Sequence, residues 1–135
     1  LDRFCVNFEL LPDSVKTRLT VENDDKASMY SVKDLMYIHK RTGIPIVFDY
    51  HHHQFCTGGL SEQEALELAI TTWPSGIKPI AHYSESKSLH EGNIKIKPQA
   101  HSDYIENLPN TYNNNIDIMV ESKAKELSLL DFIIH

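Results

Sequence analysis

Four short runs of mainly aliphatic residues lie along the chain, and each run ends in an ionisable side chain. Runs of this length that are rich in Ile, Val and Phe are typical of β-strands. We therefore predict four strands, at residues 18–22, 45–49, 77–82 and 116–121, which end at Glu22, Asp49, His82 and Glu121.

Helical periodicity fills the stretches between these runs. Ser31 is a suitable N-cap for a helix that Gly43 ends, with basic residues in its last turn. A capping box formed by Ser61 and Glu64 predicts a second helix that continues to Trp73. Two shorter helices are expected at residues 102–108 and 122–130.

The alternation of strands and helices predicts parallel βαβ units, because a parallel connection needs a crossover that returns the chain to the same end of the sheet. The predicted strand ends are 27, 33 and 39 residues apart, close to the roughly 30 residues of one unit in a TIM-type barrel. A doubly wound sheet has the same alternation, but no glycine-rich phosphate loop follows any of these strands. The pattern favours an α/β fold with four units of a parallel (β/α) TIM-type barrel, and residues 1–135 as one domain.

The composition is that of a globular domain, with 41% hydrophobic and 24% charged residues. No run reaches the roughly 18 to 20 apolar residues of a membrane span, so we expect a soluble protein with no membrane partner. Cys5 and Cys56 are isolated, which argues against a disulfide framework and a thiolate zinc site. The chain starts at Leu1, and residues 4–8 read as the end of an element that began earlier, which indicates a fragment.

The formal net charge of −6 argues mildly against a protein whose whole surface binds nucleic acid, because such binding depends on Lys and Arg. Carboxylates that hold divalent cations also count as negative in this sum, although the bound ions reverse the local field. The charge therefore excludes a uniformly basic nucleic-acid binder and leaves a metal-dependent one open.

The four strand ends are the candidate site. In a parallel barrel the carboxyl ends of the strands converge on one rim, so Glu22, Asp49, His82 and Glu121 are expected to face a common centre. Carboxylate and imidazole ligands suit manganese, zinc or iron. An acid at a strand end is usually a cap or a salt-bridge partner, so the metal hypothesis rests on the set and not on any one member.

Two further histidines are candidates. His52 follows Asp49 by three residues within the run His51–His53 and can reach the same rim, although at least one histidine of the run is expected to pack or hydrogen-bond instead. His101 is expected to open the predicted third helix, either as a ligand or as a capping or buried histidine. His90 is expected to be an exposed loop residue without a chemical role.

Several motifs occur together in a recognisable order. They are Asn7-Phe8 with Leu10-Leu11-Pro12, Leu19-Thr-Val-Glu22-Asn-Asp24, Phe48-Asp49-Tyr-His-His-His53, His82-Tyr-Ser84, Ala100-His101-Ser-Asp103 and Val120-Glu121-Ser-Lys-Ala-Lys125. Together they resemble the UV damage endonuclease family over nearly the whole chain. The resemblance implies the C-terminal half of a barrel related to that of endonuclease IV, with up to three divalent ions, typically manganese. It also implies an enzyme that cuts UV-damaged double-stranded DNA on the 5′ side of a damaged base and so initiates excision repair.

The resemblance also implies roles for single residues. Glu22 would bridge two metals, Asp49, His82 and Glu121 would complete one coordination sphere, and His52 with His101 would hold a third ion. Metal-assisted phosphodiester hydrolysis of this kind needs no protein nucleophile. One departure from the family pattern is Ile80, which stands where the family commonly has a metal-site lysine.

Partners and location follow from the same resemblance. A half barrel exposes two strand edges, so we expect it to need the missing N-terminal half of the barrel or to self-associate through these edges. The expected location is intracellular, in the nucleus of a eukaryote or the cytoplasm of a bacterium.

Two alternatives remain open from the residues. A metal-dependent sugar isomerase of a related barrel gathers the same ligand types at its strand ends. The isolated chain is otherwise a catalytically silent half barrel.

Overall fold

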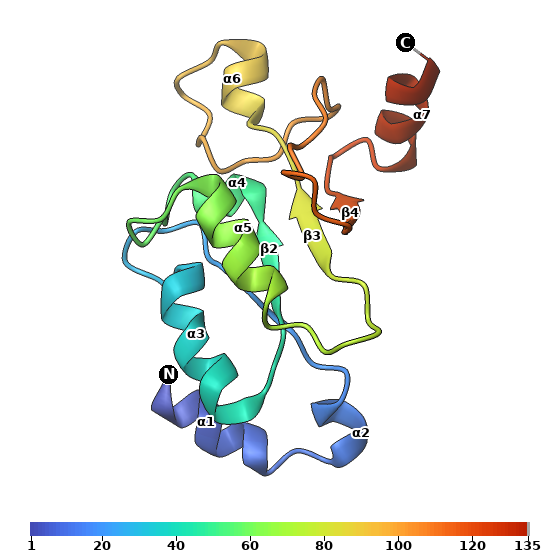
Figure 1. Ribbon diagram of the computed structural model, residues 1–135. Helices are drawn as coiled ribbons and strands as arrows, with labels where there is room; N and C mark the ends of the chain where they lie inside the picture. Colours follow the sequence, from blue (N-terminus) through green and yellow to red (C-terminus); the bar gives the residue numbers. More distant parts are fainter. Residues whose placement is uncertain (135) are drawn as a thin grey trace.

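The computed structural model describes residues 1–134, which form an α/β fold around one parallel sheet (Figure 1). The strand order β1-β2-β3-β4 follows the order in the sequence, and each neighbouring pair is parallel. The strands are β1 (Val21–Glu22), β2 (Ile46–Asp49), β3 (Ile80–Tyr83) and β4 (Asp117–Val120). The predicted parallel βαβ arrangement is confirmed.

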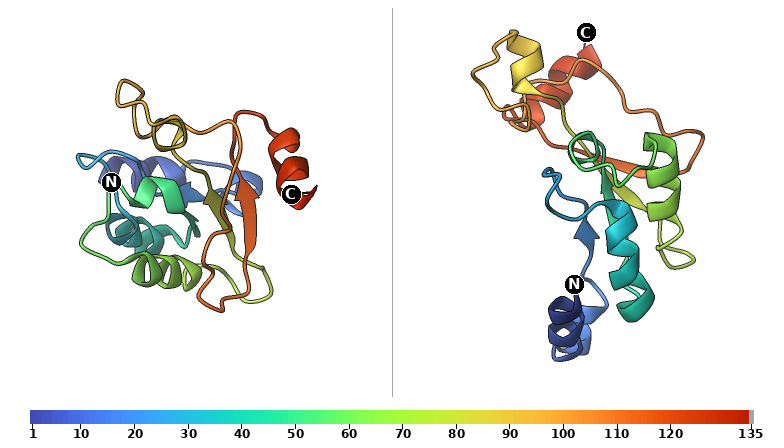
Figure 2. Two further views of the ribbon diagram at one scale, coloured as in Figure 1. Left: turned by 90° about the horizontal axis from the view of Figure 1, so that it is seen from above. Right: turned by 90° about the vertical axis from the view of Figure 1, so that its left-hand side faces the viewer.

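The helices pack against the sheet or lie beyond its ends. They are α1 (Asp2–Glu9), α2 (Asp13–Lys16), α3 (Val32–Thr42), α4 (Tyr50–His53), α5 (Glu62–Ile70), α6 (Lys87–Glu91) and α7 (Glu126–Ile134). Helices α3 and α5 pack against β2. Figures 1 and 2 show α1 and α2 beyond the amino ends of the strands, and α6 and α7 beyond the carboxyl ends. The carboxyl ends are the edge at which the candidate site lies.

The two main helices begin where the sequence predicts. Ser31 and Ser61 each accept a hydrogen bond from the third residue of the helix, and the acid at that position accepts one from the serine backbone. Gly43 ends α3 with φ of 76°, a left-handed conformation that glycine adopts without a steric cost. Helix α5 ends at Ile70, so Trp73 lies beyond it and its indole N–H donates to the Ile46 carbonyl at 2.8 Å.

Two predicted strand starts are too early. The backbone N–H groups of Arg18 and Leu19 bond to the Val15 carbonyl and close the turn after α2, so β1 begins at Val21. Ile77 likewise donates to the Pro74 carbonyl in a turn, and β3 begins at Ile80. In both places the backbone N–H groups that a strand would pair with its neighbour are hydrogen-bonded within a local turn.

The predicted helix at residues 102–108 is wrong, and the one at 122–130 is displaced. The backbone N–H groups of Glu106 and Asn107 donate to the Glu85 carboxylate, and that of Ile105 donates to the Ser128 hydroxyl. Lys123 and Ala124 donate to carbonyls of residues 102 and 103, so α7 starts only at Glu126. Helix α6, capped by Ser86, was not predicted.

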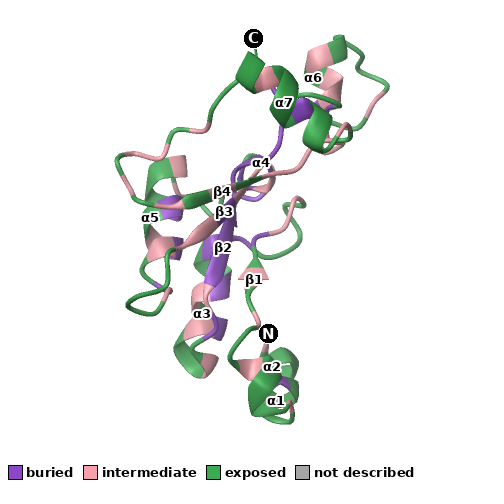
Figure 3. Cartoon of the chain, turned by 90° about the vertical axis from the view of Figure 1, so that its right-hand side faces the viewer, coloured by how far each residue is buried: buried purple, intermediate pink, exposed green. Residues whose placement is uncertain are grey.

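The core lies between β2 and the helices that cover it. All four residues of β2 are buried, whereas β1 and β4 have half-buried or exposed positions (Figure 3). Phe48 packs at the centre with residues of α3 and α5. Cys5 and Cys56 are both buried and free. None of the described helices is long and apolar enough to cross a bilayer.

Thr72 ties the loop after α5 to the first residue of β2. Its buried hydroxyl accepts from the Ile46 N–H at 2.8 Å and donates to the Ala69 carbonyl at 2.6 Å. Thr72→Val keeps the shape but leaves the Ile46 N–H unpaired, so the free energy of unfolding should fall by roughly 1–3 kcal/mol. Urea unfolding measures this; the exposed Thr71→Val is the control, and an equal effect of both would contradict the assignment.

Candidate metal centre

Asp49 is the common member of two groups of possible metal ligands at the carboxyl ends of the strands. One group is Glu22, Asp49 and His52, and the other is Asp49, His82 and Glu121. In each group one ligand atom per residue lies within 4.8 Å of the others. Five of the six predicted site residues are thus brought together: they come from β1, β2, α4 and β3 and from Glu121, which directly follows β4.

The side chain of Asn23 fixes the backbone of Asp49. β1 ends at Glu22, but the Asn23 amide continues the pairing: its oxygen accepts from the Asp49 N–H at 2.8 Å and its nitrogen donates to the Asp49 carbonyl at 3.0 Å. Asn23 and Asp49 are both fully buried. A side chain therefore replaces the next step of the strand ladder and sets the position of the central carboxylate.

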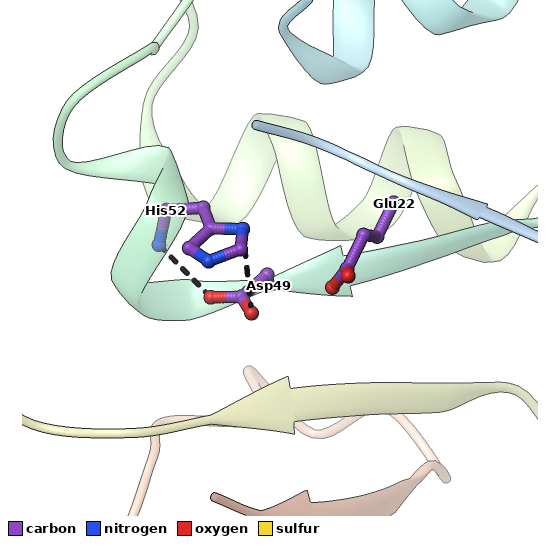
Figure 4. Close-up of side chains that lie close together, drawn as sticks. All are labelled: Glu22, Asp49 and His52. Carbon is purple, nitrogen blue, oxygen red and sulfur yellow. Dashed lines mark hydrogen bonds and ion pairs between the residues drawn. The ribbon is translucent and has the colours of Figure 1, made fainter. Parts of the chain in front are cut away.

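The turn of α4 then orients His52 (Figure 4). Asp49 is the N-cap of α4, and its Oδ1 accepts from the His52 N–H at 2.9 Å. The His52 ring places Nδ1 2.7 Å from the Asn23 carbonyl, which can only accept, so Nδ1 carries a proton. Nε2 is then the nitrogen with a free lone pair, as a metal-binding histidine requires.

His82 lies between two carboxylates. It is the neighbour of Asp49 in the sheet, and its Nδ1 is 3.1 Å from Glu22 Oε2 and 3.3 Å from Glu121 Oε1. The hydrogen bond to Glu22 raises the pKa of His82, and the same bond lowers the pKa of Glu22. The proton of His82 thus offsets, in the absence of a metal, the repulsion between the two acids.

The surroundings of the second oxygen of Asp49 indicate whether a cation fits this site. Asp49 Oδ2 is buried and accepts no hydrogen bond from residues 1–134. His52 Nδ1 is 3.5 Å away, but its proton goes to Asn23. Burial raises the pKa of Asp49 to about 6. A buried carboxylate oxygen without a donor, among two further acids and two imidazoles, fits a divalent cation held by oxygen and nitrogen ligands.

His101 lies outside both groups. An isolated bridge with Ser86 holds its backbone, and its ring meets the ring of His51 at a centroid distance of 5.7 Å. Burial lowers its pKa, and the charges of Glu121 and His52 act on it as well. His101 is therefore close to the metal-ligand groups without belonging to either in this structure.

The other histidines of the run 51–53 pack instead of facing the centre. His51 Nε2 is bonded to the Gln99 carbonyl and His53 Nε2 to the Leu60 carbonyl, and both rings are buried. Both rings thus pack and hydrogen-bond, as was predicted for at least one histidine of the run.

Sequence reasoning missed three residues around the centre. Asn23 and Glu85 were assigned no role, and His90 was expected to be exposed but donates to Glu85 at 2.8 Å with 19% of its side chain accessible. A buried asparagine or glutamate carries no local signal, because its partners are distant in sequence. Ile80, the departure from the family pattern, lies half-buried on β3. The nearby Lys78 forms an ion pair with Asp117 at 2.9 Å.

Comparisons with known proteins identify the family. The model of the UV-endonuclease UvdE family matches residues 1–134. Proteins named UV DNA damage endonuclease are 38% identical in Bacillus cereus (strain Q1) and 37% identical in Bacillus thuringiensis subsp. konkukian (strain 97-27), each covering 98% of this chain. The crystal structure of SacUVDE superposes with a TM-score of 0.79 at 38% identity, over 98% of this chain and 44% of that one. The chain spans 42% of the length of these two relatives, and the matches favour a nuclease over the sugar isomerase.

Asn23→Leu should damage both folding and metal binding. The change keeps the volume but leaves the Asp49 N–H and carbonyl buried and unpaired, at a cost of roughly 2–4 kcal/mol in unfolding free energy. Loss of the groups that orient ligands typically lowers metal affinity by about 10–100-fold. Urea unfolding and Mn²⁺ titration measure the two effects, with the exposed Asn115→Leu as control. Native Mn²⁺ affinity in Asn23→Leu would contradict this role.

The raised pKa of Asp49 makes two pH effects expected. A folded-state pKa of about 6, above the ordinary 3.8, means that the metal-free folded chain holds a proton that the unfolded chain has released. The Asp49 contribution therefore lowers stability as pH rises from about 4 to about 6, by roughly 3 kcal/mol in total. Proton competition also weakens Mn²⁺ binding below about pH 6.

Asp49→Asn separates these effects. Unfolding in the presence of a chelator at pH 5 and pH 7 should show that the variant has lost this destabilisation, because the amide stays neutral. Its Mn²⁺ affinity should be low at both pH values. A variant as unstable as the native chain at pH 7 would contradict the buried charge as the cause.

Proposed function

The chain belongs to the UV-endonuclease UvdE family, and we propose that it carries part of the metal centre of a UV damage endonuclease, which hydrolyses a phosphodiester 5′ to a damaged base in double-stranded DNA. The observation that carries the proposal is that Glu22, His82 and Glu121 come together at Asp49, whose Oδ2 is buried and has no donor.

We infer that the sheet is the C-terminal half of a (β/α) TIM-type barrel. Its strands follow one another in sequence order without a reversal, whereas a doubly wound sheet reverses at its switch point. Met119 on β4 is exposed, and His82 and Ile80 on β3 are only half-buried, so these side chains could be covered by the other half of a barrel. Four consecutive units and relatives more than twice as long support half of an eight-unit barrel.

The proposed ligand roles follow the two groups of side chains. Glu22 contacts His82 in one group and joins Asp49 and His52 in the other, so it is suited to bridge two ions. Asp49, His82 and Glu121 would hold one ion, and His52 with His101 another. Manganese is the proposed ion, because carboxylate-rich sites with imidazoles suit it, with up to three ions in the whole protein.

Bound divalent ions would supply Lewis acidity and a neutralising field for the phosphate. The residues of the chain provide the frame for this chemistry. Asp49 is kept in place by Asn23 and by the turn of α4, so its carboxylate needs no rearrangement to act as a ligand. His82 shares its proton with Glu22 and Glu121 and would give it up when a cation takes its place. Metal-assisted hydrolysis of a phosphodiester needs no protein nucleophile, so no side chain is assigned this role.

The proposed partners follow from the same assignment. UV-damaged duplex DNA is the substrate, and the remaining half of the barrel, or a second copy, would cover the outer edges of β1 and β4. The enzyme would act where the DNA lies, which is the cytoplasm for a bacterial source and the nucleus for a eukaryotic one.

Glu121→Gln should abolish nicking while folding is preserved. The amide keeps the shape but removes a charged ligand, so the rate should fall by at least about 100-fold, more than the loss of an outer partner costs. The assay is cleavage of UV-irradiated, end-labelled duplex DNA with Mn²⁺, and the exposed Glu126→Gln is the control. Retained nicking by Glu121→Gln at full metal occupancy would contradict the ligand role.

The same assay should compare this chain with a longer one that includes the upstream sequence of its source protein. Cleavage by the longer chain alone would support a site divided between the two halves. Failure of both to cleave would favour the metal-dependent sugar isomerase or the catalytically silent half barrel.

A further inference from the structure

His101 is held by a segment without regular secondary structure. Residues 92–116 connect α6 to β4, and within them only the bridge between Ser86 and His101 pairs with the β3 side of the chain as a strand would. The Ser102 N–H donates to the Glu85 carbonyl at 2.8 Å, and the Lys87 N–H donates to the Ala100 carbonyl at 2.9 Å. The place of His101 therefore depends on what fixes residues 85–87.

The Glu85 side chain is the point at which this segment is tied down. Its carboxylate accepts from the Glu106 N–H at 2.7 Å, from the Asn107 N–H at 3.0 Å and from the Asn107 side chain at 3.3 Å. It also accepts from His90 Nε2 at 2.8 Å and from the Tyr83 hydroxyl. One buried acid thus joins the end of β3, α6 and the residues that follow His101.

Only a carboxylate satisfies this set of partners. All five groups are donors, and an ionised carboxylate offers acceptors on both oxygens and no donor. Burial opposes ionisation of Glu85, but the hydrogen bonds from Tyr83, Glu106, Asn107 and His90 outweigh it, so the pKa of Glu85 is lowered. A glutamine in its place would direct an N–H group at other N–H groups.

The opposite side of the segment is held by the region before α7. Lys123 and Ala124 donate their N–H groups to the carbonyls of Ser102 and Asp103, and Ile105 donates to the buried Ser128 hydroxyl. Residues 101–107 are thus fixed between the Glu85 network and the residues that directly follow Glu121. The segment connects the strand end of β3 with that of β4.

We propose that Glu85 is a positioning residue for the metal centre. Glu85 holds His101 within reach of the cation that His101 and His52 would bind together. The proposal rests on the proposed function, since it takes His101 as a ligand. Glu85 is not itself a ligand, because its oxygens are occupied by five donors. It acts through the backbone of residues 85–87 and 101–107.

The test is a titration of the source protein, in its full length, with Mn²⁺ and detection of free Mn²⁺ by electron paramagnetic resonance. Glu85→Gln should weaken the binding step that also depends on His101 by about 10-fold or more, the usual effect of losing a group that orients a ligand. His101→Ala should weaken the same step. The double variant should bind Mn²⁺ as tightly as His101→Ala alone, because both changes remove the same interaction.

The control and the second variant keep the test decisive. Glu126→Gln introduces the same amide at the exposed first residue of α7, outside the Glu85 network, and it should leave the titration unchanged. If Glu85→Gln does not fold, Asn107→Ala removes one of the five hydrogen bonds at an exposed residue and should shift the same step in the same direction. A native titration of Glu85→Gln, or of Asn107→Ala where that variant replaces it, would overturn the proposal.

Two other outcomes separate the proposal from the function on which it rests. Additive losses of Mn²⁺ affinity from Glu85→Gln and His101→Ala would show that Glu85 acts independently of His101, and would overturn the proposal. A native protein that binds Mn²⁺ but does not nick irradiated DNA would contradict the proposed function, and the titration would still decide the role of Glu85.

Discussion

The pairing of the Asn23 side chain with the Asp49 backbone is the interaction on which the arrangement of the metal centre depends. β1 has only two residues in the sheet, so its ladder ends before it reaches the carboxyl edge of β2. The Asn23 amide extends this ladder by a side chain, and its backbone carbonyl holds the His52 ring. The common position of Glu22, Asp49 and His52 thus depends on one buried residue, Asn23. Because Asn23 is buried, water does not compete for its hydrogen bonds.

Burial of the central acid would favour binding of a cation at the candidate site, and it makes the metal-free fold less stable. Asp49 keeps one oxygen without a donor at the edge of a closely packed strand, an arrangement that a protein selected for stability alone would avoid. His82 limits the resulting repulsion by bonding to Glu22 and contacting Glu121. The ligand geometry is therefore present before a cation arrives, and the cation would replace a proton instead of reorganising the strands.

The sequence contained the strand ends and the helix caps because these signals are local. Ser31 and Ser61 begin their helices as predicted, and the strand ends near 22, 49, 82 and 121 come together as parallel pairing requires. The segment at 102–108 failed because its N–H groups bond to Glu85, a residue about twenty positions earlier. Asn23 was missed for the same reason, since its partners at Asp49 lie 26 residues away. Local patterns predict where elements begin and end, but not which distant side chain satisfies a backbone group.

The acidic character of the chain is consistent with a DNA substrate once the position of its charges is considered. The net charge of −6 includes Glu22, Asp49 and Glu121, which are gathered at one edge of the sheet. Without cations this edge would repel a phosphate, because the carboxylates of Glu22, Asp49 and Glu121 lie together there. With divalent ions held by the same carboxylates, the local field at that edge would become positive. Attraction of DNA to this edge would then depend on the metal, as cleavage does.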